Sequence, residues 1–370
     1  MSEGKSSETS RLTQAGVGEF LTEANFCDAI SENSQIQISA SEIPEFVFQN
    51  WQVQGLVEER VSTDNQSELS ASMTRLKNST GAIRAFSKIQ LKSMSEVCES
   101  LSGEVRYSLL KSSALRAAYY TNPHARIGWD IDIAVDKQQL PLATEVLLSL
   151  GYEFAQFDSN TKRFSPADPV LRAYVESQHY ELGFLVRRNR VLGLSDDQKD
   201  QIRSTIRDGG YWHIDENGDF YCYTTIDVHH GLSLELPVTQ LIEDGQSHDF
   251  GQQTVTLPSP SWLAYHVIYK LYWEGVHAYG KGLYQYADLI RIVLKLDERE
   301  QSNLIERLES SNLGIPGLYT LRRLPKHFGM DLPDTLAEYV GSMAPRVGVD
   351  PLQKNDLGDM WEKIWGRYEI

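Results

Sequence analysis

The sequence predicts an α+β fold in which a mixed sheet carries helices and is flanked by helical segments at both ends. Apolar residues recur at helical spacing from Ser67 to Leu101 and again beyond Ser259. Between these segments, short runs alternate apolar and polar residues, as strands do. An Asn-Gly turn within residues 215–219 separates two aromatic, alternating runs and indicates a β-hairpin.

The chain of 370 residues is long enough for two domains of ordinary size. Residues 1–14 are polar and offer little apolar surface to bury, so we expect a disordered tail there. The pattern then predicts a helical segment at 15–102, a mixed core at 103–257 with an insertion at about 187–222, and a helical domain at 258–370.

Composition argues against several classes of protein. The net charge of −16 argues against nucleic acid as the main partner, because such binding requires Lys and Arg to neutralise phosphates. We interpret the most basic run, Arg187–Arg190, as a solvated loop. Three widely separated cysteines support neither a disulfide framework nor a structural zinc site. Without a signal peptide or an apolar run of membrane-spanning length, we expect a cytoplasmic protein that does not enter a membrane.

The run Asp130–Val135 alternates acidic or small residues with β-branched ones and predicts a strand. Because side chains on a strand alternate between faces, Asp130 and Asp132 point to the same side while Ile131 enters a core. Two carboxylates on one face repel each other, and a divalent cation between them relieves that repulsion. An exposed edge strand with two solvated aspartates is the alternative.

The residues before the acidic run predict a strand at Val105–Leu110, a small-residue turn at 111–113 and a helix at Ala114–Tyr120. Small residues at a strand-to-helix turn let backbone N–H groups approach an anion, and the helix dipole favours negative charge there. The turn therefore suits the phosphates of a nucleotide.

A later predicted strand, Tyr223–His230, carries a third carboxylate. Asp227 and His229 share one face of this strand, so Asp227 can join the earlier pair if the two strands are neighbours. His230 points to the other face and cannot share a metal with His229. We expect His229 to support the site from outside the shell of metal ligands, and His230 to pack.

Three segments carry a resemblance to a known family: Leu110–Leu115, Arg126–Asp132 and Ile226–His230. Together they resemble the bacterial nucleotidyltransferase-like family of the DNA polymerase beta superfamily, over roughly residues 70 to 300. That family's signature is a Gly/Ser turn, an Asp-x-Asp strand and a third acidic residue on a later strand. Ser112 departs from it, because the family usually has Gly at this position.

The resemblance implies that Asp130, Asp132 and Asp227 are the catalytic residues and hold two Mg²⁺ ions, with Mn²⁺ as the alternative metal. It also implies a C-terminal helical domain that closes over the nucleotide. The nucleotide-binding residues implied in this way are Lys111, Ser112, Ser113, Arg126, His266 and Lys270. His179 and Lys281 are further candidates for contact with substrate.

The implied reaction moves a nucleoside monophosphate from an NTP, such as ATP, to an acceptor that the sequence does not name. That acceptor is a small molecule or a protein. Two other functions stay open. One is a catalytically silent relative that binds a nucleotide or a partner, which Ser112 and the insertion favour. The other is transfer of a phosphoryl group by the same carboxylates.

Overall fold

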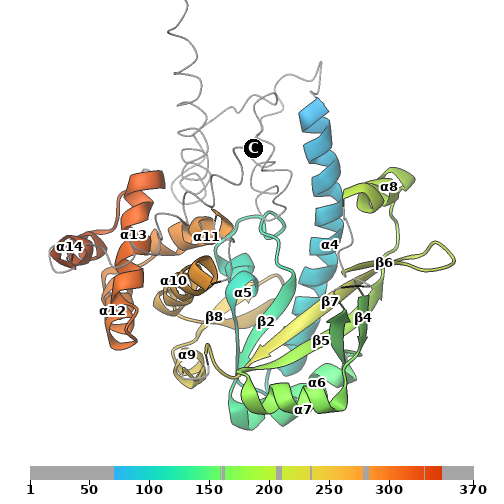
Figure 1. Cartoon of the computed structure of the whole chain (residues 1–370), viewed down its shortest axis with the longest axis horizontal. Helices are drawn as coiled ribbons and strands as arrows, with labels where there is room; N and C mark the ends of the chain where they lie inside the picture. The colour runs from blue at the N-terminus through green and yellow to red at the C-terminus, as the bar shows by residue number, and fades with distance from the viewer. Residues whose placement is uncertain are drawn as a thin grey trace, which may run out of the picture. The chain divides into compact units, whose positions relative to one another are not determined.

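The structure is a computed structural model that describes residues 71–158, 160, 163–205, 211–233, 236–277, 283–328 and 330–343 (Figure 1). The chain divides into two compact units. One comprises Ser39–Ser259, and the other comprises Met1–Ile38 with Pro260–Ile370. The predictions for residues 1–70, and for the end of the chain beyond residue 343, lie outside the described residues.

A mixed sheet forms the centre of the Ser39–Ser259 unit, and over the described residues it has seven strands in the order β1-β2-β7-β5-β3-β4, with β6 beside β7. The strands are β1 (Tyr107–Leu109), β2 (Asp130–Val135), β3 (Glu153–Asp158), β4 (Arg163–Pro166), β5 (Glu181–Arg190), β6 (Trp212–Ile214) and β7 (Phe220–His229). β2 and β7 run parallel, whereas the other pairs are antiparallel. The predicted mixed sheet and α+β class are therefore confirmed.

Helices and a small second sheet surround this sheet. The helices are α4 (Ala71–Leu101), α5 (Lys111–Ala118), α6 (Leu140–Ser149), α7 (Pro169–Gln178), α8 (Asp196–Thr205) and α9 (Thr239–Glu243). A 3-10 turn, Lys137–Gln139, precedes α6, and β8 (Gln246–Phe250) pairs with β9 (Gln253–Leu257). In Figure 1, α4 runs along the sheet, where it contacts β2 and β7.

The core of this unit lies between α4 and the central strands. Phe86, Met94 and Leu101 of α4 are buried, as are Ile131 of β2 and Ile226 of β7. Helix α4 runs without a break through Gly81 and ends at Leu101. Gly103, just beyond it, adopts a φ of +86°. A residue with a Cβ rarely adopts that conformation, so glycine is well suited to the turn that leads into β1.

The segment predicted as an insertion is continuous with the main sheet. β5 and β7 pair continuously from Phe184 with Asp227 to Arg190 with Tyr221, and β6 forms the expected hairpin with β7. The hairpin turns at 215–219, where Gly218 has a φ of +80°. The interpretation of Arg187–Arg190 as a loop is wrong, because these residues end β5, and their side chains alternate between partly buried and exposed as on a strand.

The second unit is helical over its described residues beyond Ser259, as predicted. Its helices are α10 (Pro260–His277), α11 (Leu283–Val293), α12 (Glu298–Ser310), α13 (Gly314–Phe328) and α14 (Asp334–Met343). Asp297 caps α12 by accepting a hydrogen bond from Glu300 N. Within the described parts of the chain, no helix combines the length and apolar character needed to cross a membrane.

Candidate metal-binding site

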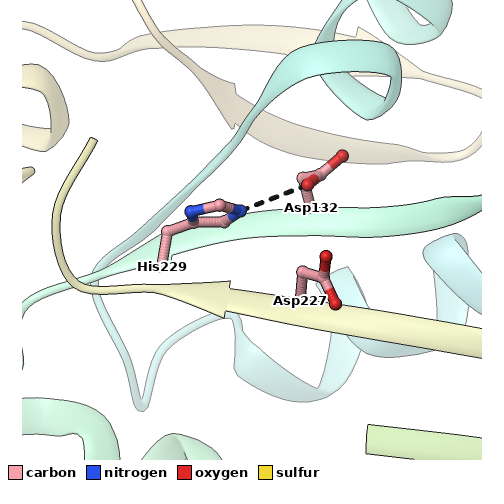
Figure 2. Close-up of side chains that lie close together, drawn as sticks. All are labelled: Asp132, Asp227 and His229. Atoms are coloured by element: carbon pink, nitrogen blue, oxygen red, sulfur yellow. Dashed lines mark hydrogen bonds and ion pairs between the residues drawn. The ribbon is translucent and has the colours of Figure 1, made fainter. Parts of the chain in front are cut away.

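The acidic residues meet because β2 and β7 are parallel neighbours. Asp132 of β2 lies directly opposite Asp227 of β7, and Asp130 lies opposite Thr225. Side chains two residues apart on a strand share a face, so Asp130, Asp132, Asp227 and His229 all project from one side of the sheet. Figure 2 shows the Asp132 and Asp227 carboxylates close to the His229 ring.

This group of side chains is largely removed from water. Asp132 and His229 are each 1% exposed, and Asp227 is 9% exposed. Burial, and after it the charge of Asp132, raises the pKa of the Asp130 carboxyl. Burial, followed by the charges of Asp130 and Asp132, holds the pKa of Asp227 well above its ordinary value. The metal-free site therefore resists carrying all of its negative charge at once.

Lys111 supplies positive charge to the site. Its Nζ lies 2.5 Å from Asp132 Oδ1. Burial alone would lower the pKa of Lys111, but the nearby carboxylates, Asp132 first, outweigh that effect and raise it. Lys111 also has a φ of +45°, an unusual backbone conformation for a residue with a side chain. The fold thus holds an ammonium group against Asp132 at some conformational cost.

His229 lies between two carboxylates. Its Nε2 is 3.2 Å from Asp132 Oδ1, and its Nδ1 is 3.2 Å from Glu181 Oε1. One ligand atom each from Asp132, Asp227 and His229 all lie within 4.8 Å of one another, a spacing that one metal ion could span. His229 is therefore within reach of a shared metal ion, and the expectation that it stays outside the ligand shell stays a prediction.

The side chains present fit a divalent cation. Asp132 Oδ2 is buried and accepts no hydrogen bond from the described part of the chain. A buried carboxylate oxygen without a donor is costly, and a hard cation is the usual partner for such an atom. Asp227 offers a carboxylate oxygen within 4.8 Å of one from Asp132, and Asp130 projects from the same face, so the oxygen donors present fit Mg²⁺ or Mn²⁺.

Comparison with protein families gives a result that agrees with this geometry. A family described as "Uncharacterised nucleotidyltransferase" matches residues 47–329, which is about three quarters of the chain. The chain belongs to this family. A search of curated proteins finds no match.

Within this nucleotidyltransferase fold, the turn before α5 differs from its prediction. The helix begins at Lys111 rather than at Ala114, so Ser112 and Ser113 lie in its first turn. Ser113 Oγ accepts a hydrogen bond from Asp132 N at 3.1 Å and so joins the helix to the acidic strand. The prediction missed this start because Leu110, which precedes the helix, makes no side-chain cap.

Gly128 accommodates the serine that departs from the resemblance. A Cβ built on Gly128 would collide with Ser112 Oγ and lie 3.0 Å from Ser112 Cβ. The Ser112 hydroxyl is buried and has no hydrogen-bond partner in the described chain. Its side chain therefore fills the space that glycine leaves in the loop before β2.

The other predicted nucleotide contacts are Arg126, His266 and Lys270. Arg126 is 3% exposed, and its guanidinium donates to the carbonyl of Ile127. His266 and Lys270 lie one turn apart on α10, in the other unit of the chain. Their roles stay predictions, and Lys281 lies outside the described residues. His179 comes near the cluster, with Nδ1 3.7 Å from Glu181 Oε2.

Two residues of the site were not anticipated. Glu181 of β5 faces His229, and Tyr211 stacks on Trp129 with ring centroids 5.0 Å apart. Burial, and then the charges of Asp130 and Asp227, raises the pKa of the Tyr211 hydroxyl, which places that hydroxyl near the carboxylates. No local pattern marks either residue, because both depend on how β7 pairs with its neighbours.

Proposed function

We propose that the protein transfers a nucleoside monophosphate from an NTP to a small-molecule or protein acceptor, at a metal site formed by Asp130, Asp132 and Asp227. The observation that carries this proposal is the parallel pairing of β2 with β7, which sets Asp132 opposite Asp227, where Asp132 Oδ2 is buried and accepts no hydrogen bond from the described residues. Membership in a nucleotidyltransferase family supports it. Kinship with the DNA polymerase beta superfamily is part of the proposal.

The bound metal ions, Mg²⁺ or Mn²⁺, would neutralise the triphosphate and the departing pyrophosphate. The chain supplies the remaining electrostatic contacts. Lys111 presents an ammonium group beside Asp132, and the first turn of α5 has no side-chain cap to compete with a phosphate for backbone N–H groups. In the reaction, the acceptor nucleophile bonds to the α-phosphorus, and the bond from that phosphorus to the pyrophosphate oxygen breaks.

Few further catalytic groups are required, because this chemistry depends on positioning and charge neutralisation. The rigid part of the site is the sheet itself. Ser113 fixes α5 to β2, and the β2–β7 register fixes the three carboxylates relative to one another. The C-terminal helices, with His266 and Lys270, would contribute contacts to the nucleotide.

The test combines binding and product analysis. The protein is mixed with each of the four NTPs, with Mg²⁺, Mn²⁺ or EDTA, and its melting temperature and pyrophosphate release are followed. We expect an NTP to raise the melting temperature only when metal is present, because ligand that binds the native state stabilises it by mass action. The Asp132→Asn variant should lose this response, whereas Asp249→Asn, the same change on exposed β8, should keep it.

Product mass identifies the reaction. A gain of one nucleotide on an acceptor supports nucleotidyl transfer, whereas a gain of one phosphate assigns phosphoryl transfer to the same carboxylates. Equal NTP affinity with metal and with EDTA would overturn the metal-dependent site. If NTP binds but nothing is transferred, and Ser112→Gly strengthens that binding, the protein is the silent relative that Ser112 favours.

A further inference from the structure

His229 is held between carboxylates of two different strands. Its ring lies on β7 with Nδ1 facing Glu181 of β5 and Nε2 facing Asp132 of β2, each nitrogen 3.2 Å from the nearest oxygen. The ring of Tyr180 lies parallel to it, with centroids 6.1 Å apart and an angle of 26°. The imidazole is 1% exposed, so its orientation is set by these neighbours rather than by water.

The facing carboxylates restrict where the imidazole can carry its proton. A carboxylate oxygen accepts hydrogen bonds, so the ring proton can lie on Nε2, facing Asp132 Oδ1, or on Nδ1, facing Glu181 Oε1. Figure 2 shows the contact between Nε2 and Asp132 Oδ1, and a metal ion bound to Nε2 would replace a proton there and leave Nδ1 to donate to Glu181. A carboxylate that orients an imidazole in this way is the usual partner of a metal-ligating histidine.

We propose that His229 is a metal ligand, that Glu181 positions it, and that the site consequently prefers a divalent transition-metal ion to Mg²⁺. The set consists of two carboxylates and one imidazole, because one ligand atom each from Asp132, Asp227 and His229 lie within 4.8 Å of one another. Mg²⁺ takes oxygen ligands almost exclusively, whereas imidazole nitrogen favours first-row transition metals. This inference rests on the metal site of the proposed function but does not depend on the transfer reaction.

The experiment uses MnCl₂ as the probe, with the full chain and without nucleotide. Pulsed electron paramagnetic resonance detects coupling between Mn²⁺ and a directly bound nitrogen, which an oxygen-only site lacks. Titration with Mn²⁺ and with Mg²⁺ gives the ratio of the two dissociation constants. We expect nitrogen coupling in the wild-type protein, and tighter binding of Mn²⁺ than of Mg²⁺.

Three variants separate the roles of the residues. His229→Asn should abolish the nitrogen coupling and weaken Mn²⁺ binding more than Mg²⁺ binding. Glu181→Gln should keep the coupling but weaken Mn²⁺ binding by about 10- to 100-fold, the usual cost of losing the partner of a metal-ligating histidine. His230→Asn is the matched control, because His230 directly follows β7 and is not part of the group of possible metal ligands found among the described residues, so the nitrogen coupling and the metal affinities should stay at wild-type values.

The outcomes distinguish this inference from the proposed function. Absence of nitrogen coupling in the wild-type protein, or an unchanged Mn²⁺ to Mg²⁺ ratio in His229→Asn, would overturn the inference even if NTP is turned over with Mg²⁺. Conversely, nitrogen coupling without any nucleotidyl transfer would uphold the ligand and remove the proposed reaction. If His229→Asn fails to fold, the wild-type spectrum and Glu181→Gln still decide the question.

Discussion

Two clusters of charged side chains lie along the sheet, and they differ in how their charge is balanced. In the first, which we call the arginine cluster, Arg187 pairs with Glu96 at 2.7 Å and donates to Ser93 Oγ at 2.9 Å. Its guanidinium also lies 4.8 Å from the centre of the Tyr152 ring. A carboxylate, a hydroxyl and an aromatic face thus surround this single cation.

The acidic cluster is not balanced in this way. Asp130, Asp132 and Asp227 gather around one ammonium group, that of Lys111, and Glu181 adds a fourth carboxylate on the far side of the histidine. Burial and mutual repulsion raise the pKa values of Asp130 and Asp227. We expect the arginine cluster to stabilise the fold, and the acidic cluster to lower stability, despite Lys111, until a metal ion joins it. Strongly perturbed groups of this kind are concentrated at functional sites.

The largest expected effect comes from removing one acidic ligand. Asp227→Asn keeps the size of the side chain but removes a negative charge. If Asp130 and Asp132 hold the nucleotide, NTP affinity should survive, while turnover should fall by roughly 10²- to 10³-fold, the cost of losing one preorganised electrostatic contact to the transition state. Steady-state kinetics and calorimetric titration measure the two quantities separately. Wild-type turnover in this variant would refute the three-carboxylate site.

The second prediction concerns the contact that places Lys111. Gly128→Ala should force Ser112 out of position and cost about 1–3 kcal/mol of unfolding free energy, the usual price of overpacking. Ser112→Gly removes both atoms that the new methyl group would meet at 3.0 Å or less. The double variant should therefore be more stable than the sum of the two single changes predicts.

Urea unfolding of the four proteins gives the coupling energy directly. Strict additivity would contradict the predicted collision between the loop and α5. The next atom, Asp130 O, lies 3.4 Å from the added Cβ, which is an ordinary van der Waals contact, so it should add no cost in the double variant. This cycle tests the placement of α5 without relying on any catalytic activity.

The third prediction sets the two clusters directly against each other. Glu96→Gln leaves Arg187 without its carboxylate and should lower the unfolding free energy by about 1 kcal/mol, since Glu96 is partly exposed and its charge is partly screened. In EDTA, Asp227→Asn should instead leave stability unchanged or raise it, because the lost charge was repelled by its neighbours. Loss of stability in both variants would remove the distinction between the clusters.

Much of the acidic site could be predicted because strand alternation is a local property. The pattern of residues 130–135 is enough to put Asp130 and Asp132 on one face of their strand. The pattern of residues 223–230 likewise puts Asp227 and His229 on one face of theirs. Their meeting also required β2 and β7 to be parallel neighbours, which no short pattern reveals. The family resemblance supplied that expectation, and the register of Asp132 with Asp227 agrees with it.

Glu181 could not be predicted for a physical reason. The register of β5 against β7 shifts between Glu181 and Phe184, where Gly183 has a φ of +80°. This irregularity brings Glu181 opposite His229. Regular antiparallel pairing continued from Phe184 and Asp227 would instead place Leu182 opposite His229. The position of His229 between two carboxylates therefore depends on a backbone feature that the sequence marks only by one glycine.

The smallest expected effect is a pH dependence that the acidic cluster alone should produce. Burial, followed by neighbouring carboxylates, raises the pKa of Asp130 and Asp227 in the folded protein. Such a group binds its proton more tightly in the folded than in the unfolded chain. Its contribution therefore favours folding at low pH and is lost as the pH rises, from the ordinary carboxyl pKa of about 4 up to the raised value.

Melting temperatures in EDTA between pH 5 and pH 8 measure this contribution as the difference between wild type and Asp227→Asn. The wild type should lose stability relative to the variant as the pH rises, because the variant has no carboxyl group to ionise at position 227. Added Mg²⁺ or Mn²⁺ should raise the wild-type melting temperature more at pH 8 than at pH 5, since metal binds the deprotonated ligands and competes with protons. A difference that stays constant with pH would show that repulsion within the cluster is already relieved without metal, and the acidic cluster would then resemble the arginine cluster.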